Sequence, residues 1–171
     1  MAEVELRPGT MADVRGIRAV GEAVVPPTYG PIDVAYAQHM LDEWWSVERL
    51  TVLMQKFPHV VAELDGEVVG MANLGRVSSA SHRDLGQVDG DREVMWKLYV
   101  HPDHHGAGIG SRLLAAVEDL VEGEELWLEV VDGNDRAESF YRARGFEEVE
   151  RVPDAALPDD IWFRKQLDRP Q

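Results

Sequence analysis

A glycine-rich segment between a strand and an amphipathic helix most restricts what this chain can fold into. Glu93–Val100 reads as a strand, and Gly106, Gly108 and Gly110 follow it closely. From Ile109 to Val121 the apolar residues recur at helical spacing. A strand that passes through a tight turn into such a helix packs the helix on the sheet, so a mixed α/β domain is expected.

Apolar patterns along the rest of the chain predict the other strands and helices. Strands are expected at Val4–Arg7, His59–Leu64, Glu67–Leu74, Glu125–Val131, Phe146–Val152 and Ile161–Leu167. Helices are expected after Asp13 and at Val34–Leu41, Val47–Gln55 and Asp135–Arg144. Strands and helices thus alternate along the chain.

Prolines and glycines mark the expected boundaries. Pro26 and Pro27, followed by Gly30 and Pro31, are expected to break the first helix. The pair Asp65-Gly66 between two apolar runs predicts a two-residue hairpin turn. Residues 76–91 are polar and rich in Gly and Ser, which predicts a long mobile connection.

Composition limits the domain count and the compartment. A chain of 171 residues with 44% hydrophobic content is expected to form one domain, residues 1–171, with a real core. The absence of cysteine excludes disulfides, thiolate metal sites and a cysteine nucleophile. No run approaches the ~20 apolar residues of a membrane span, and residues 1–9 lack a secretory layout. A cytoplasmic protein without a membrane partner is therefore expected.

The charge balance limits the partners. Thirty-two acidic and 17 basic residues give a net charge of −15, which repels nucleic-acid phosphates, so nucleic acid is not an expected partner. This acidity has two interpretations. It serves solubility, or it attracts a cationic substrate.

The glycine-rich turn suits a pyrophosphate. Glycines let the backbone N–H groups approach an anion closely, and the helix N-terminus adds a partial positive charge. The alternative is a tight turn without a ligand. A P-loop would need Lys-Ser or Lys-Thr where Ser111-Arg112 follows Gly110, and the dinucleotide fingerprint needs a different glycine order.

Two segments resemble the signatures of the GCN5-related N-acetyltransferases (GNAT). Leu98–Leu114, LYVHPDHHGAGIGSRLL, is similar to their coenzyme A motif, Gln/Arg-x-x-Gly-x-Gly/Ala, with His105 at the first position. Val131–Phe146 is similar to their second signature, in which Asn134 is followed by Ala137, then by Phe-Tyr at Tyr141 and by Gly-Phe. The two motifs occur in the family's order.

The resemblance implies a fold, a co-substrate and a set of binding residues. The fold would be a mixed, mostly antiparallel, twisted central sheet of six to seven strands flanked by four to five helices. The co-substrate would be acetyl-coenzyme A, with no metal, and transfer to a primary amine would be direct, in a ternary complex. The implied cofactor-binding residues are Leu98, Tyr99, Val100, His105, Gly106, Ala107, Gly108, Ile109, Gly110, Ser111, Asn134, Ala137 and Tyr141.

Two catalytic roles follow from this resemblance. Tyr141 is expected to protonate the departing thiolate, because phenol and thiol have comparable pKa values. An amine with a pKa near ~10.4 must also lose a proton before it attacks. Glu93 is the candidate base, although family members often carry the acid one position later, where Val94 stands. The alternatives are Tyr29, Glu63 and Glu129.

Histidines and tryptophans suggest weaker possibilities. Close spacing of His101, His104 and His105 allows a metal interpretation, but these residues precede the turn assigned to the cofactor phosphates, so no metal is expected. Tryptophans can line an amine pocket through cation–π contacts, although core packing is their commoner role. The tryptophans considered for this pocket are Trp44, Trp45 and Trp96.

The acceptor is the least specified part of the reaction. Residues 26–46 resemble the corresponding stretch of PaiA-like polyamine acetyltransferases, which implies a small polyamine as substrate. Other small amines, aminoglycosides and protein N-termini stay open, and so does a homodimer. A different class of function is a non-catalytic acyl-coenzyme A sensor or interaction domain with the same fold.

Overall fold

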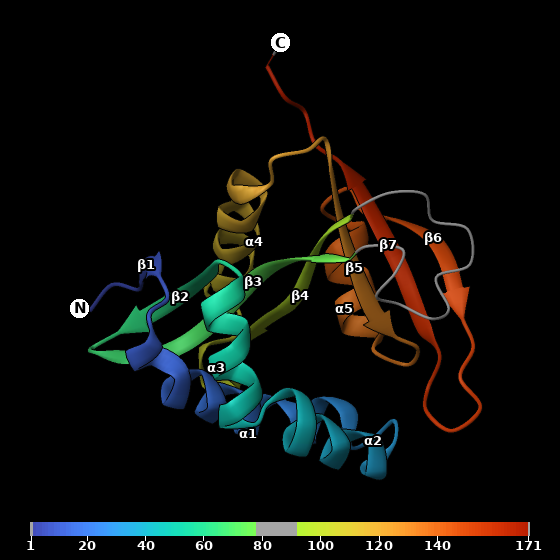
Figure 1. Ribbon diagram of the computed structural model, residues 1–171, viewed down its shortest axis with the longest axis horizontal. Helices are drawn as coiled ribbons and strands as arrows, with labels where there is room; N and C mark the ends of the chain where they lie inside the picture. Colours follow the sequence, from blue (N-terminus) through green and yellow to red (C-terminus); the bar gives the residue numbers. More distant parts are fainter. Residues whose placement is uncertain (1, 78–91, 171) are drawn as a thin grey trace.

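The computed structural model describes residues 2–77 and 92–170. Within them, seven strands form one sheet in the order β1-β2-β3-β4-β5-β7-β6 (Figure 1). The strands are β1 (Glu5–Pro8), β2 (His59–Leu64), β3 (Glu67–Val77), β4 (Arg92–Val100), β5 (Glu125–Val131), β6 (Glu147–Val152) and β7 (Asp160–Gln166). All neighbours are antiparallel except β4 and β5. The predicted mixed, mostly antiparallel α/β fold is confirmed.

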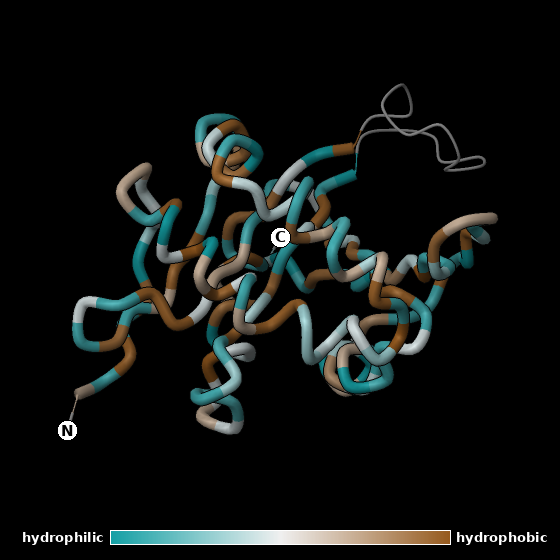
Figure 2. The backbone as a smooth tube through the Cα atoms, turned by 90° about the horizontal axis from the view of Figure 1, so that it is seen from below, coloured by the Kyte–Doolittle hydropathy of each residue, from teal (hydrophilic) through white to brown (hydrophobic). Residues whose placement is uncertain are grey.

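Helices cover both faces of this sheet. On one face, α1 (Val14–Tyr29), α2 (Val34–His39), a turn of π-helix (Met40–Trp44) and α3 (Val47–Lys56) share an apolar cluster with β2, β3 and β5. On the other face, α4 (Ile109–Leu120) and α5 (Asp135–Arg142) pack on the strands. Figure 2 shows hydrophobic and hydrophilic segments alternating along the helices, as expected when each helix buries one side.

The first helix is longer than the prolines predicted. Pro26 and Pro27 lie inside α1, which ends at Tyr29. Each proline lacks a backbone N–H, but the ladder resumes after them, because Gly30 N–H donates to the Pro26 carbonyl at 2.9 Å. The predicted break at Pro26 and Pro27 is therefore wrong, whereas the helix does end before Gly30 and Pro31, and the extra turn carries Tyr29 over the sheet.

The predicted hairpin turn is confirmed. Asp65 and Gly66 adopt positive φ angles of 52° and 84°, as a two-residue turn between β2 and β3 requires. Of the predicted mobile connection, Arg76 and Val77 belong to β3, and the rest lies outside the described residues. In residues 2–77 and 92–170, no helix combines the length and the apolar content needed to cross a membrane.

The sheet opens between its two central strands. Parallel strands β4 and β5 pair at Val94 with Trp127 and at Met95 with Leu128. Beyond these pairs the strands run apart toward their carboxyl ends (Figure 1). Backbone and side chains of both strands are therefore available to ligands at the opening.

One close contact allows a test of this packing. A Cβ on Gly21 of α1 would lie 2.3 Å from Cε3 of Trp45, a side chain with no exposed surface. Overpacking typically costs about 1–3 kcal/mol, whereas Ala gains about 1 kcal/mol in helix propensity over Gly. We expect Gly21→Ala to lower the free energy of unfolding in urea titrations.

An exposed position in the same helix measures the effect of helix propensity alone. Ala19 lies in α1 with its side chain exposed, so Ala19→Gly is expected to cost about 1 kcal/mol. A stabilised Gly21→Ala variant would contradict the contact with Trp45.

Candidate functional site

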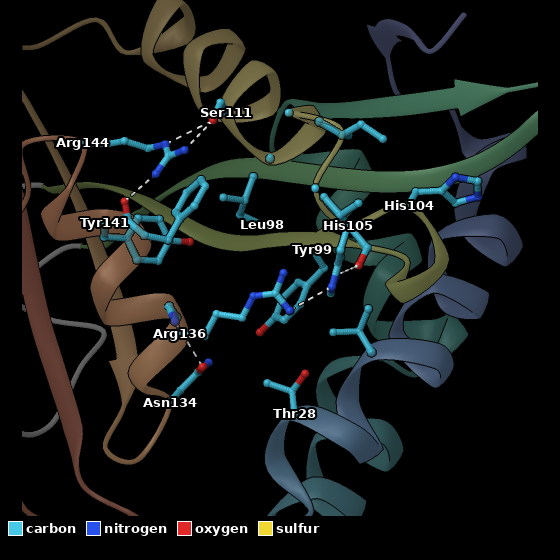
Figure 3. A pocket seen from close by; sticks show the side chains of 18 residues that line it. Thr28, Leu98, Tyr99, His104, His105, Ser111, Asn134, Arg136, Tyr141 and Arg144 are labelled. Carbon is cyan, nitrogen blue, oxygen red and sulfur yellow. Dashed lines mark hydrogen bonds between the residues drawn. The ribbon is translucent and has the colours of Figure 1, made fainter. Parts of the chain in front are cut away.

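Two cavities lie at the opening of the sheet. The first, the glycine cavity, has a volume of about 440 Å³ and is lined by β4, the glycine turn, α5 and the end of α1 (Figure 3). The second, the tryptophan cavity, has a volume of about 420 Å³ and is lined by α1–α3, β4, β5 and the first residue of β7. Tyr99 lines both cavities.

The glycine cavity brings together the residues that the two motifs predicted. Of the predicted cofactor-binding residues, Ala107 does not line this cavity. The residues that do are Leu98, Tyr99, Val100, His105, Gly106, Gly108, Ile109, Gly110, Ser111, Asn134, Ala137 and Tyr141.

The glycine turn has the geometry of an anion cradle. Gly106 and Gly108 have φ angles of +82° and +76°, and a Cβ on either would meet no atom within 4 Å. In the described part of the chain, the backbone N–H groups of residues 106–111 bind no acceptor. The first to do so is Arg112 N–H, at 3.2 Å from the Gly108 carbonyl. Free amides at a helix N-terminus suit phosphate oxygens.

Two arginines that the sequence reasoning missed line the same cavity. Arg144 donates from Nη2 to Ser111 Oγ at 2.7 Å and stacks 3.7 Å from the Phe140 ring centroid. Arg136 reaches across the cavity to His105 (Figure 3). Both lie within the Val131–Phe146 signature, Arg136 in α5 and Arg144 just after its end, but only the folded chain places them beside the glycines.

The contacts of His105 determine which of its ring nitrogens carries the hydrogen. Arg136 Nη1 lies 3.0 Å from His105 Nδ1, and since a guanidinium only donates, Nδ1 is the acceptor. His105 Nε2 therefore carries the hydrogen and donates to the Val100 carbonyl at 2.8 Å. This hydrogen bond occupies the Val100 carbonyl of β4, at the edge of the opening.

Three tyrosines meet where the cavities join. The Tyr29 and Tyr99 hydroxyls are hydrogen-bonded at 2.8 Å. Burial, followed by the nearby Tyr29, raises the pKa of Tyr141 above its ordinary value, so its phenol stays protonated at neutral pH. Asn134 caps α5, with Oδ1 accepting from Ala137 N–H at 3.3 Å, which fixes the helix that carries Tyr141.

Aromatic rings form the walls of the tryptophan cavity. All three tryptophans considered for an amine pocket, Trp44, Trp45 and Trp96, line it. Edge contacts at centroid distances of 5.0–5.9 Å link Trp45 to Tyr99, and Tyr36 to both Trp44 and Tyr29. These contacts make the walls rigid and apolar.

Charged side chains of both signs also line the tryptophan cavity. Burial, and then Asp160, raises the pKa of Glu129 to about 8, and burial is the main reason that the pKa of Asp160 rises to about 6. Lys97 and Arg49 lie in the same cavity. Burial lowers the pKa of Lys97 to about 8, helped by the Arg49 charge.

The structure does not bring Glu93 to either cavity. Its carboxylate accepts the backbone N–H groups of Glu122 at 3.0 Å and Gly123 at 2.7 Å, so it holds the end of α4. Glu63, one of the alternatives, pairs with Arg7 at 2.6 Å. Among the candidate bases, Tyr29 and Glu129 line the tryptophan cavity.

The histidine cluster has no metal-like arrangement in the described residues. His101 and His104 stack edge-on at 5.9 Å, and His105 faces Val100 and Arg136. No group of three or more His, Cys, Asp or Glu residues in this part of the chain is placed to hold a metal ion.

Similarity to known proteins agrees with this geometry. The N-alpha-acetyltransferase RimI of Mycobacterium tuberculosis is 34% identical over 91 residues, 53% of this chain and 52% of that protein. The chain thus spans about half of that relative's length. The L-methionine sulfoximine/L-methionine sulfone acetyltransferase of Pseudomonas aeruginosa is 28% identical over 168 residues, 92% of this chain and 88% of that protein.

A solved structure shares the fold. The PaiA N-acetyltransferase of Thermoplasma acidophilum, in complex with coenzyme A, superposes with a TM-score of 0.77 at 21% identity, over 96% of this chain and 99% of that one. The model of the acetyltransferase (GNAT) family matches residues 23–146, which contain the glycine turn and the Asn134 helix. The chain therefore belongs to the acetyltransferase (GNAT) family.

Proposed function

We propose that this protein transfers the acetyl group of acetyl-coenzyme A directly to a primary amine of a small molecule, in a ternary complex. The observation that carries the proposal is the opening between β4 and β5, where a glycine cradle and a carboxylate-lined cavity meet at Tyr99. Binding both reactants in adjoining cavities supplies the proximity that direct transfer needs.

The glycine cavity fits the co-substrate. Acetyl-coenzyme A supplies an activated thioester when it is bound. The amides of residues 106–111 would hold its pyrophosphate, with Arg136 and Arg144 close by as cations. The edge of β4 from Leu98 to Val100 would hold the pantetheine arm like an added strand, and a free N–H there would stabilise developing negative charge on oxygen.

Glu129 is the proposed general base. Its raised pKa, about 8, lies close to neutral pH, where a base accepts a proton most effectively. Glu129 removes one proton from the acceptor ammonium, so that the nitrogen lone pair can form the new N–C bond. Glu93 is not proposed for this step, because two backbone amides and the end of α4 occupy its carboxylate.

Tyr141 is the proposed general acid. As the C–S bond breaks, its hydroxyl donates a proton to the departing sulfur. The phenol is protonated at neutral pH, so the proton is available, although the burial that raises its pKa makes Tyr141 a weaker acid than a free phenol. A second proton leaves the nitrogen as the neutral amide forms and restores Tyr141 through solvent. The proton held by Glu129 passes to solvent, so the reaction releases one proton overall.

The acceptor is a small amine in this proposal. The carboxylates of Glu129 and Asp160 and the aromatic walls support an ammonium ligand. Relatives carry names that refer to N-alpha-acetylation and to L-methionine sulfoximine, which supports amine acceptors of more than one kind. The polyamine expected from the sequence is not part of this proposal, and the cytoplasmic location and the homodimer stay predictions.

The cradle yields the first test of this function. Gly108→Val adds a β-branched side chain at a positive φ angle, in the open space meant for phosphate, so binding of coenzyme A should become undetectable by calorimetry. Gly66→Val is the matched control, since Gly66 also has a positive φ angle, +84°, and open space, but lies in the β2–β3 turn. Equal loss of affinity in both variants would contradict the cradle.

Tyr141 separates binding from turnover. Tyr141→Phe removes only the hydroxyl, so affinity for coenzyme A should stay within about twofold while kcat falls about 10²-fold or more. Thiol release from acetyl-coenzyme A, measured with a panel of amines, provides the rate. Binding without release by the wild-type protein, on every amine, would favour the acyl-coenzyme A sensor instead.

The base is tested by the pH dependence. Because Glu129 acts as the base only when deprotonated, wild-type kcat/KM should rise through an apparent pKa near 8. Glu129→Gln should lower kcat/KM by about 10²-fold or more and abolish this rise with pH. If Glu93→Gln abolished the rise of kcat/KM with pH and Glu129→Gln kept it, Glu93 would be the base, as expected from the sequence.

A further inference from the structure

In the part of the chain that the structure describes, the tryptophan cavity contains a buried cation that no carboxylate neutralises. Lys97 is only 8% exposed, and its Nζ lies 5.2 Å from the centroid of Trp45. Within residues 2–77 and 92–170, no carboxylate pairs with this ammonium, and its charged neighbour is Arg49, which repels it. An unpaired buried charge is costly, so this cavity is built for a ligand that brings a negative charge.

The opposite wall carries carboxylates that are also unpaired in the described part of the chain. Glu129 projects from β5, and Asp160 stands opposite Val131, at the start of β7. Burial of Glu129 and the charge of Asp160 raise the pKa of Glu129 to about 8, so at neutral pH the negative charge of this wall lies mainly on Asp160, whose pKa is about 6. This wall is therefore complementary to a cation.

The opening of the sheet keeps the two walls apart. The cations belong to α3 and β4, whereas the carboxylates belong to β5 and β7, on the other side of the point where β4 and β5 separate. No ion pair of 4.0 Å or less joins the walls among these described residues. The cavity thus has a positive side and a negative side.

We propose that the tryptophan cavity binds a small zwitterion, a primary amine that also carries a carboxylate or a similar anionic group. The anionic group faces Lys97 and Arg49, and the ammonium group faces Glu129, which places it at the proposed base. This inference rests on the proposed function, because the ammonium nitrogen is the one that becomes acetylated. Aromatic walls favour an apolar side chain on the ligand.

A polyamine fits this charge pattern poorly. Its first ammonium would satisfy Glu129 and Asp160, but a second would face Lys97 and Arg49. Like charges in a partly buried site repel strongly. With a pKa of about 8, Lys97 is mostly protonated at pH 7, so the repulsion persists there.

Matched pairs of acceptors test the inference in the wild-type protein. L-phenylalanine with 2-phenylethylamine, and L-leucine with 3-methylbutylamine, differ only in the carboxylate. We expect kcat/KM for thiol release at pH 7 to be at least about tenfold higher with each amino acid, the effect of one charge-assisted contact. Equal rates within a pair, or faster release with spermidine, would overturn the inference.

Variants of Lys97 assign the preference to one residue. Lys97→Met keeps an unbranched side chain, one heavy atom shorter and without the charge, and it should lower kcat/KM about tenfold or more further for the amino acids than for the amines without a carboxylate. Lys97→Arg should restore most of the preference. Lys56→Met removes the same charge from an exposed position at the end of α3 and should leave the preference unchanged.

The experiment separates two failures. If no amine or amino acid releases thiol, the proposed transferase function itself is wrong. If thiol is released without regard to the carboxylate, or if Lys97→Met keeps the preference, only the zwitterion is wrong. Calorimetry with coenzyme A on each variant verifies that the glycine cavity is intact.

Discussion

Among the described residues, strands β4 and β5 are joined at two residue pairs before they separate, and the remaining features of the site depend on this. A continuous ladder would occupy the backbone edge of β4 and close the space between the strands. Because the ladder stops, ligands can reach the backbone of Leu98–Val100 from one side and the side chains of Lys97 and Glu129 from the other. Antiparallel pairing elsewhere keeps the opening rigid.

Local signals were enough to predict most of the fold and one half of the site. The hairpin at Asp65-Gly66 and the amphipathic helix from Ile109 depend on neighbouring residues, which the sequence displays directly. The glycine turn and the Asn134 helix are also short segments, so their residues were found together. Sequence could not show that α1 continues through Pro26, because the packing of α1 against the sheet overrides a local preference.

Arg49 and Lys97 were missed, and Glu129 was one of three alternative bases, because these residues converge only in the folded chain. Arg49, Lys97 and Glu129 come from a helix and two strands far apart in sequence, and no local spacing connects them. Glu93 was chosen for its place on the correct strand, but its carboxylate ends among the amides after α4. The net charge of −15 allows solubility or a cationic substrate as its interpretation, whereas the cavity itself presents both signs. Local charge is a property of tertiary structure.

The prolines at the end of α1 have a consequence for ligand binding. Their rings fix φ even in the unfolded chain, so the last turn loses less backbone freedom on folding than an ordinary turn would. That turn presents Tyr29 to Tyr99, at the junction of the two cavities. A junction that is already ordered does not have to be frozen when substrates arrive. Substrate binding then loses less free energy to ordering the protein, and more of the binding free energy is available to align the reacting atoms.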